Sequence, residues 1–273
     1  MTQSLIFAHR GANNEAAENT RAAFDKALTY AIDGIETDVQ LSRDDVAVLW
    51  HDRFLNKVGL PGKHIDDFDY AQLQTMDFAA HFSPGTEPHC IMTLQEFIDA
   101  YRKRCRLLLE IKNRDWETPA RHAIKVRQTM DMVGVVIDDA IMVSSFNLAS
   151  LIYANQYRPG FPLVYNFEPE QTLEDARRVL AEQSFLHGLC LPIESLDDAM
   201  VKLLRGHGKG IAVYTCNSAA EINKALELGV DILISDVPER ALQIRANIQT
   251  SCNPPSSLPS HTCGRGAGGE GGV

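Results

Sequence analysis

Short apolar runs alternate along the chain with longer segments in which apolar residues recur at helical spacing. The short runs are typical of buried strands, and they occupy Leu5–His9, Gly34–Asp38, Val46–His51, Leu107–Lys112, Ile141–Ser145, Leu163–Asn166, Gly188–Leu191, Ile211–Thr215 and Asp231–Ser235. The longer segments predict amphipathic helices, several opened by capping residues, and they include Thr20–Ala31, Thr93–Arg102, Trp116–Met132, Leu173–Gln183, Ala199–Gly206 and Ala219–Leu228. This alternation predicts an α/β fold with a parallel sheet or barrel.

Nine expected strands are one too many for a (β/α)8 TIM barrel. The connection between the second and third runs is too short for a parallel crossover, which needs about a dozen residues. We therefore expect an antiparallel ribbon in which Gln40–Leu41 pairs with Val46–Ala47 across a turn at 42–45. That register would place His51 opposite Glu36, at the mouth of the second barrel strand.

Two further segments differ from this rhythm. The stretch at about 53–92 contains Gly, Pro and several Asp residues with weak periodicity, which predicts a small insertion after the ribbon. It would lie above the carboxyl ends of the strands, where barrel enzymes keep their active sites. The barrel domain is expected to span 1–248, followed by a disordered tail at 249–273 that is rich in Pro, Ser and then Gly.

The charge of the chain narrows the partners to expect. A formal net charge of -10 argues against nucleic acid and anionic membrane surfaces, which bind through clustered Lys and Arg. No run approaches the roughly 20 apolar residues that cross a bilayer, and no export signal is visible at the amino terminus. We expect a cytoplasmic protein without stable membrane insertion, whose six scattered cysteines are reduced thiols. A small phosphate ester remains a suitable partner, because a bound divalent cation can reverse the charge locally.

Carboxylates stand at the carboxyl ends of two expected strands. Glu36 and Asp38 are two residues apart, so their side chains point the same way. Glu110 ends a neighbouring barrel strand and could complete an all-oxygen site for Mg²⁺ or Ca²⁺. The alternative is that these groups are solvated strand ends or ion-paired carboxylates.

Histidines and cations stand at the same mouth. His9 and His51 would flank the carboxylates, and phosphodiester cleavage needs one group that accepts a proton and one that donates it. Arg10 and Lys112 supply positive charge suited to the phosphate oxygens. For Lys112 the alternative is an exposed lysine that only neutralises Glu110.

On these residues the chain resembles the glycerophosphodiester phosphodiesterase family, over about 5–241. The matching motifs, in order, are His9-Arg10-Gly11, Glu18-Asn19-Thr20, Glu36-x-Asp38-Val39, His51-Asp52, Glu110-Ile111-Lys112, Ser144-Ser145-Phe146, Tyr214-Thr215-Cys216-Asn217, Gly229-Val230-Asp231 and Ser235-Asp236-x-Pro238. Three positions depart from the family pattern. Ala17 stands where Pro is usual, Asp44-Asp45 replaces Asp-Gly at the ribbon turn, and Tyr214 stands where Trp is common.

The resemblance implies a TIM barrel with an insertion after the ribbon, and it implies roles for individual residues. The metal ligands would be Glu36, Asp38 and Glu110, the catalytic acid and base His9 and His51, and the substrate contacts Arg10, Lys112, Phe146 and Tyr214. We expect metal-dependent hydrolysis of glycerophosphodiesters to glycerol 3-phosphate and an alcohol. Two alternatives stay open: a lipid-directed phosphodiesterase resembling phospholipase C or D, and a barrel that binds phosphate esters without turnover. The head group, the choice of metal, the nucleophile and the oligomeric state are not set by the sequence.

Overall fold

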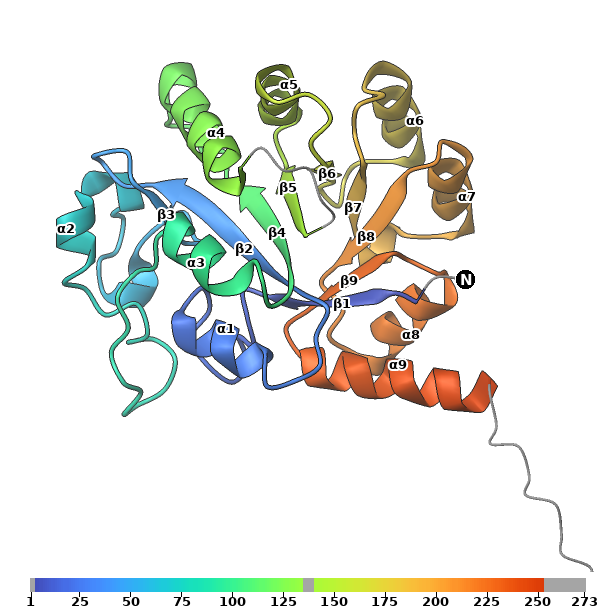
Figure 1. Cartoon of the computed structure of the whole chain (residues 1–273), viewed down its shortest axis with the longest axis horizontal. Coiled ribbons are helices and arrows are strands. Elements are labelled where there is room, and N and C mark those ends of the chain that lie inside the picture. The colour runs from blue at the N-terminus through green and yellow to red at the C-terminus, as the bar shows by residue number, and fades with distance from the viewer. Residues whose placement is uncertain (1–2, 135–139, 253–273) are drawn as a thin grey trace, which may run out of the picture.

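The predicted alternation of strands and helices is present in the computed structural model, which describes residues 3–134 and 140–252 (Figure 1). Its strands are β1 (Leu5–His9), β2 (Gly34–Leu41), β3 (Ala47–Leu49), β4 (Arg106–Ile111), β5 (Ile141–Ser145), β6 (Leu163–Asn166), β7 (Gly188–Pro192), β8 (Gly210–Tyr214) and β9 (Ile232–Ser235). Its α-helices are α1 (Arg21–Ala27), α2 (Tyr70–Leu73), α3 (Leu94–Tyr101), α4 (Pro119–Val133), α5 (Leu148–Tyr157), α6 (Leu173–Glu182), α7 (Asp198–Gly206), α8 (Ala219–Glu227) and α9 (Pro238–Cys252). Short 3₁₀ turns lie at 56–58, 65–67 and 193–195.

Eight of the strands close into a parallel barrel. The order around it is β1, β9, β8, β7, β6, β5, β4 and β2, and pairing of β1 with β2 closes the circle. The remaining strand, β3, pairs antiparallel with β2, as the surplus strand in the sequence predicted. The expectation of a (β/α)8 TIM barrel is therefore confirmed, with a ribbon at the end of its second strand.

The predicted register of that ribbon is wrong by one residue. Leu41 pairs with Ala47 rather than Val46, so continuing the register places His51 opposite Thr37 and not Glu36. The cause is a shorter loop of three residues, 43–45, closed by a hydrogen bond of 3.0 Å from Ser42 N–H to the carbonyl of Val46. Asp45 occupies the left-handed region with φ 61°, a conformation that Asp tolerates and that suits three-residue loops.

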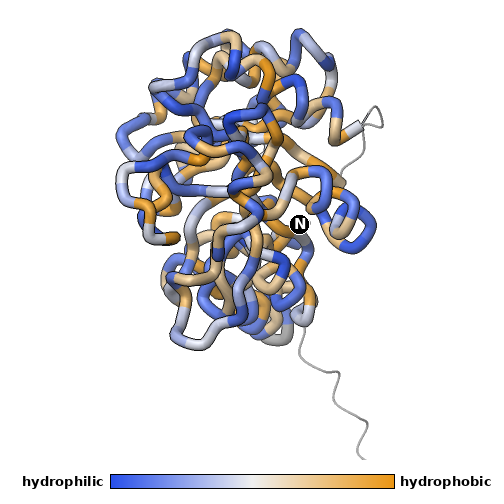
Figure 2. Tube along the Cα trace, turned by 90° about the vertical axis from the view of Figure 1, so that its left-hand side faces the viewer, coloured by the Kyte–Doolittle hydropathy of each residue, from blue (hydrophilic) through white to orange (hydrophobic). Residues whose placement is uncertain are grey.

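Alternation along the strands separates the barrel interior from the layer under the helices. Apolar side chains such as Phe7 and Leu108 pack together inside the barrel, whereas Ile35 and Leu109 pack outward in the larger core. Gly34 begins β2 on the interior face, where an added Cβ would lie 2.4 Å from the Phe7 ring. Figure 2 shows hydrophobic and hydrophilic positions alternating along the chain, as expected of elements with one buried face.

The helices begin where polar residues satisfy their first free N–H groups. At α3 the Thr93 hydroxyl accepts from the N–H of Glu96, and the Glu96 carboxylate accepts from the N–H of Thr93 at 2.8 Å. Ser218 forms the same reciprocal cap at α8. Helix α1 ends at Ala27, earlier than expected, where the Thr29 hydroxyl donates to the carbonyl of Lys26.

The segment between β3 and α3 forms a small layer with its own apolar core. Trp50 and Phe78 meet edge to face at 5.3 Å between ring centroids, among other buried side chains. Figure 1 shows this insertion beside β2 and β3, at the left of the view. At the other end of the chain, α9 continues to Cys252, into the start of the expected tail, and 253–273 lie outside the described residues. The domain boundary at 248 stays a prediction.

Within the described residues, no helix combines the length and apolar character needed to span a bilayer.

Candidate active site

The end of β1 directs two predicted site residues toward the barrel mouth. His9 is the last residue of the strand, and Arg10 follows in the left-handed region with φ 58°. The backbone N–H of Arg10 donates to the carbonyl of Glu36 at 2.9 Å, so a hydrogen bond to the neighbouring strand β2 fixes the start of the turn. Gly11 has φ 85°, and a Cβ there would lie 2.5 Å from the Ala23 carbonyl carbon. This sharp turn explains why glycine follows His9-Arg10.

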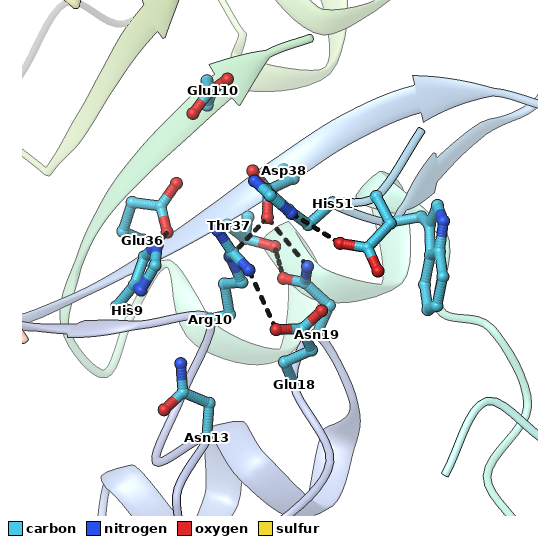
Figure 3. Close-up of polar contacts among 12 residues, drawn as sticks. His9, Arg10, Asn13, Glu18, Asn19, Glu36, Thr37, Asp38, His51 and Glu110 are labelled. Atoms are coloured by element: carbon cyan, nitrogen blue, oxygen red, sulfur yellow. Dashed lines mark hydrogen bonds and ion pairs between the residues drawn. The ribbon is translucent and has the colours of Figure 1, made fainter. Parts of the chain in front are cut away.

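Three carboxylates converge at the carboxyl ends of β2 and β4 (Figure 3). Glu36, Asp38 and Glu110 are all buried, and each offers an oxygen within 4.8 Å of the other two. Glu36 and Asp38 lie on the interior face of β2, and Asp38 pairs in register with Glu110 on β4. The sequence prediction that these side chains come together agrees with this geometry.

Two cations are paired with the carboxylates. The Arg10 guanidinium lies 3.1 Å from Asp38, and the Lys112 ammonium lies 3.2 Å from Asp38 and 2.7 Å from Glu110. Burial alone would raise the pKa of Asp38, but Lys112 and Arg10 outweigh it and hold that pKa well below its usual range. Lys112 is only 8% exposed, so it is not the exposed lysine of the alternative interpretation.

Glu36 differs from its neighbour. Burial and the negative charges of Asp38 and Glu110 raise the pKa of Glu36 well above its usual range. Its Oε2 atom is buried without a hydrogen-bond partner among the described residues, and His9 Nε2 lies 3.9 Å away. A divalent cation bound to these oxygens would satisfy this atom and relieve the repulsion, so the residues fit an all-oxygen metal site.

His9 is held by a residue from the far end of the chain. Its Nδ1 lies 2.6 Å from the Asp236 carboxylate, which follows β9. The same carboxylate accepts from the side-chain amides of Asn13 and Asn217, each at 2.6 Å. Burial, assisted by Arg10, lowers the pKa of His9 although Asp236 opposes the change. With Nδ1 facing a carboxylate, the Nε2 atom is left with the lone pair and faces the carboxylate cluster.

His51 is held by its neighbour and by two loops. Its Nδ1 lies 2.9 Å from Asp52, whose other oxygen lies 3.1 Å from the ammonium of Lys57 in the insertion. Arg114, between β4 and α4, donates to the carbonyls of His51 and Asp52. Burial alone would raise the pKa of Asp52, but the hydrogen bond with His51 and the charge of Lys57 lower it to about 2.

The two predicted aromatic residues lie across the mouth, after β5 and at the end of β8. Phe146 and Tyr214 meet edge to face with centroids 5.8 Å apart, and the Lys112 ammonium lies 5.9 Å from the Phe146 ring. The Tyr214 hydroxyl donates to the carbonyl of Phe167, which fixes its ring. The aromatic pair therefore forms one wall beside the cationic side of the site.

Sequence reasoning did not assign roles to several residues of this network. Asp236 was within a matching motif but had no partner in view, because its contact with His9 spans 227 residues. Asn19 lies in a matching motif too, and its buried amide donates to Asp38 at 2.9 Å. Lys57 and Arg114 lie in segments of weak periodicity, where no sequence signal pointed to the site.

A cavity of about 910 Å³ lies at the opposite end of the barrel, among the first residues of the strands. Two of its charged residues, Arg205 and Asp231, are paired with each other at 2.7 Å. The candidate site is therefore placed at the carboxyl end, where the histidines and carboxylates converge.

Comparison with known proteins agrees with this geometry. Residues 9–240 match the glycerophosphoryl diester phosphodiesterase family. A glycerophosphodiester phosphodiesterase of Bacillus altitudinis is 29% identical over 247 residues, covering 89% of this chain and 99% of that protein.

Two solved structures share the fold. A phosphodiesterase of Oleispira antarctica, in complex with the product sn-glycerol-3-phosphate, has a TM-score of 0.78 and 24% identity, covering 89% of this chain and 96% of its own. The glycerophosphodiester phosphodiesterase of Thermotoga maritima has a TM-score of 0.72 and 23% identity, covering 89% and 99%. The chain belongs to the glycerophosphoryl diester phosphodiesterase family.

Proposed function

We propose that this enzyme hydrolyses glycerophosphodiesters to glycerol 3-phosphate and an alcohol. One observation carries the proposal: two histidines, each supported by an aspartate, flank a buried cluster of three carboxylates and two cations. The relative from Oleispira antarctica binds glycerol 3-phosphate as its product, and the relative from Bacillus altitudinis bears the same activity in its name. Both support this substrate class.

The carboxylate cluster provides the proposed metal site. Glu36, Asp38 and Glu110 would hold one Mg²⁺ or Ca²⁺, which when bound withdraws charge from a phosphoryl oxygen. Arg10 and Lys112 would then contact the remaining phosphate oxygens, because their heads already face the carboxylates that share the site. The aromatic pair Phe146 and Tyr214 would contact the glycerol or the head group.

The histidines would divide the proton transfers. His9 acts as the base: its lowered pKa keeps it neutral near pH 7, and Asp236 leaves its Nε2 free to accept a proton from the attacking oxygen. His51 acts as the acid and gives its Nε2 proton to the departing alcohol. The Asp52 carboxylate stabilises the protonated ring of His51 before that transfer.

A cytoplasmic location of the enzyme is also part of this proposal.

The test measures glycerol 3-phosphate released from glycerophosphocholine and glycerophosphoethanolamine with Mg²⁺, Ca²⁺ or EDTA. We expect release that needs the metal and that falls roughly 10²- to 10⁴-fold in the His9→Ala and His51→Ala variants. Release from lysophospholipid vesicles but from no soluble diester would favour the lipid-directed alternative. Binding of a diester without turnover under any metal condition would favour the binding barrel.

A further inference from the structure

A hollow of about 330 Å³ opens beside Asp236 and Lys57, the side chains that hold His9 and Asp52. Three segments far apart in the sequence form its walls: the β1–α1 loop, the insertion and the end of β9, which contribute Asn13, Glu18, Lys57, His81, Phe82 and Asp236. Figure 3 shows Asn13 beside His9, on the side away from Glu110. The hollow is therefore separate from the metal cluster but adjacent to the groups proposed to move protons.

The carboxylates of the hollow are already engaged. Glu18 accepts from Arg10 at 2.9 Å with one oxygen and from Lys57 at 2.7 Å with the other. The Asp236 carboxylate accepts hydrogen bonds from the side-chain amides of Asn13 and Asn217 and lies at hydrogen-bond distance from His9 Nδ1. Neither carboxylate has a free charge to offer a cationic ligand.

Two of the residues that line the hollow each have an unsatisfied polar atom. Asn13 Oδ1 and His81 Nδ1 are buried and have no hydrogen-bond partner among the residues that the structure describes. The Asn13 amide nitrogen must face Asp236, because a carboxylate only accepts, so its oxygen is left as an acceptor. Burial, with a contribution from Lys57, lowers the pKa of His81, so its neutral ring can also accept a hydrogen bond. Buried unsatisfied polar atoms on residues that line a cavity point to a ligand with matching donors.

Resting on the proposed function, we propose that this hollow receives the departing alcohol and favours an uncharged, hydroxyl-rich alcohol over a quaternary ammonium alcohol. A hydroxyl group donates to Asn13 or His81 and accepts from the Lys57 ammonium. A trimethylammonium group has no N–H or O–H and leaves both acceptors unpaired, which a site built for hydroxyl groups discriminates against strongly.

We assign the hollow to the departing arm of the diester through Lys57, although Asp236, which also lines the hollow, holds His9. Lys57 lines the hollow and also holds Asp52, the partner of His51. His51 is the proposed proton donor to the departing alcohol, so that alcohol must lie on the side of the site that His51 serves. The other arm is left to the wall formed by Phe146 and Tyr214.

The first experiment compares kcat/KM of the wild-type enzyme for glycerophosphoglycerol and glycerophosphocholine. We expect the polyol diester to be favoured by about tenfold or more, the discrimination expected for at least one unmatched hydrogen bond. Equal values, or a preference for the choline diester, would overturn the inference while leaving the proposed hydrolysis intact. Hydrolysis of neither diester would instead remove the proposed function itself.

The second experiment changes the insertion side of the hollow. The His81→Phe variant should lose most of the preference for the polyol diester, and His81→Gln, which keeps a hydrogen-bonding side chain, should retain part of it. His89→Phe is the matched control, because His89 belongs to the same insertion but does not line the hollow. An unchanged preference in His81→Phe, or an equal loss in His89→Phe, would contradict the assignment.

Discussion

The two histidines of the site carry the same kind of partner but are held in different ways. His9 ends a barrel strand, its side chain is 17% exposed, and its aspartate comes from the opposite end of the chain. His51 follows a ribbon, its side chain is 33% exposed, and its aspartate is the next residue. Asp236 is the only described side chain that binds the His9 ring at hydrogen-bond distance, whereas Arg114 and Gln40 hold the backbone around His51.

This difference shows that one fold can orient two similar catalytic groups with different numbers of supporting side chains. The orientation of His9 depends on one carboxylate, because its strand fixes the backbone but leaves the ring free to rotate. The orientation of His51 is shared among a carboxylate, a half-buried guanidinium and a side-chain amide. Removing one partner should therefore cost more at His9 than at His51.

The largest effect is expected from Asp236→Asn. An amide cannot accept from His9, Asn13 and Asn217 together, so the His9 ring loses both its orientation and its preferred tautomer. We expect kcat to fall roughly 100-fold or more, with KM changed much less because Asp236 does not touch the phosphate. Steady-state kinetics on a soluble diester measures both constants. A variant that kept kcat and raised KM would show that Asp236 binds substrate instead.

Asp52→Asn should have a smaller effect. The amide oxygen can still accept from His51, and Arg114 still binds the carbonyls of His51 and Asp52. We expect kcat to fall roughly tenfold, at the lower end of the range for groups that orient a catalytic residue. If Asp52→Asn lowered kcat as much as Asp236→Asn, the proposed redundancy at His51 would be wrong.

Arg114→Leu directly tests the hydrogen bonds that hold the backbone carbonyls of His51 and Asp52. Losing the guanidinium leaves the carbonyl of His51 unpaired, while Gln40 still donates to the carbonyl of Asp52 at 3.1 Å. We expect kcat to fall by only a few fold, because the hydrogen bond from Gln40 remains. Combining Arg114→Leu with Asp52→Asn should cost more than the sum of the two free energies, since both hold the same residue. Additive losses in this double-mutant cycle would indicate independent roles.

The smallest expected effect concerns stability at low pH. Burial would raise the pKa of Asp236, but the hydrogen bond and charge of His9 lower it to about 2, below the ordinary value of 3.8. A depressed folded pKa contributes stability above about pH 4, and this contribution is lost as pH falls toward 2. We expect the free energy of unfolding of Asp236→Asn to fall less over this range than that of the wild type, by about 1 kcal/mol. Urea unfolding at pH 4 and pH 3 measures it, and parallel curves would contradict it.

The periodicity of the sequence was sufficient to predict much of the barrel. Side chains alternate along a strand, so Glu36 and Asp38 were expected on one face, and the structure places both in the barrel interior opposite Glu110. The ribbon register could not be derived in the same way. It depends on whether Asp45 enters the left-handed region, which is a choice of one residue that apolar patterning does not record.

The supporting residues were beyond the sequence for a different reason. Asp236 and His9 are separated by 227 residues, and their contact exists only because β9 lies beside β1 in the closed barrel. Lys57 reaches Glu18 and Asp52 from a segment without periodicity. Contacts of this kind follow from the path of the folded chain, so they appear only when the topology is known.

The pairing of β1 with β9 also links activity to the order in which the protein is made. His9 leaves the ribosome 227 residues before Asp236, yet the two must meet for the base to be oriented. Contacts between such distant segments form late in folding, because the intervening chain must first be ordered. A nascent or truncated chain that lacks the last strand would carry the whole carboxylate cluster and still be a poor catalyst. Turnover would then report that barrel closure is complete.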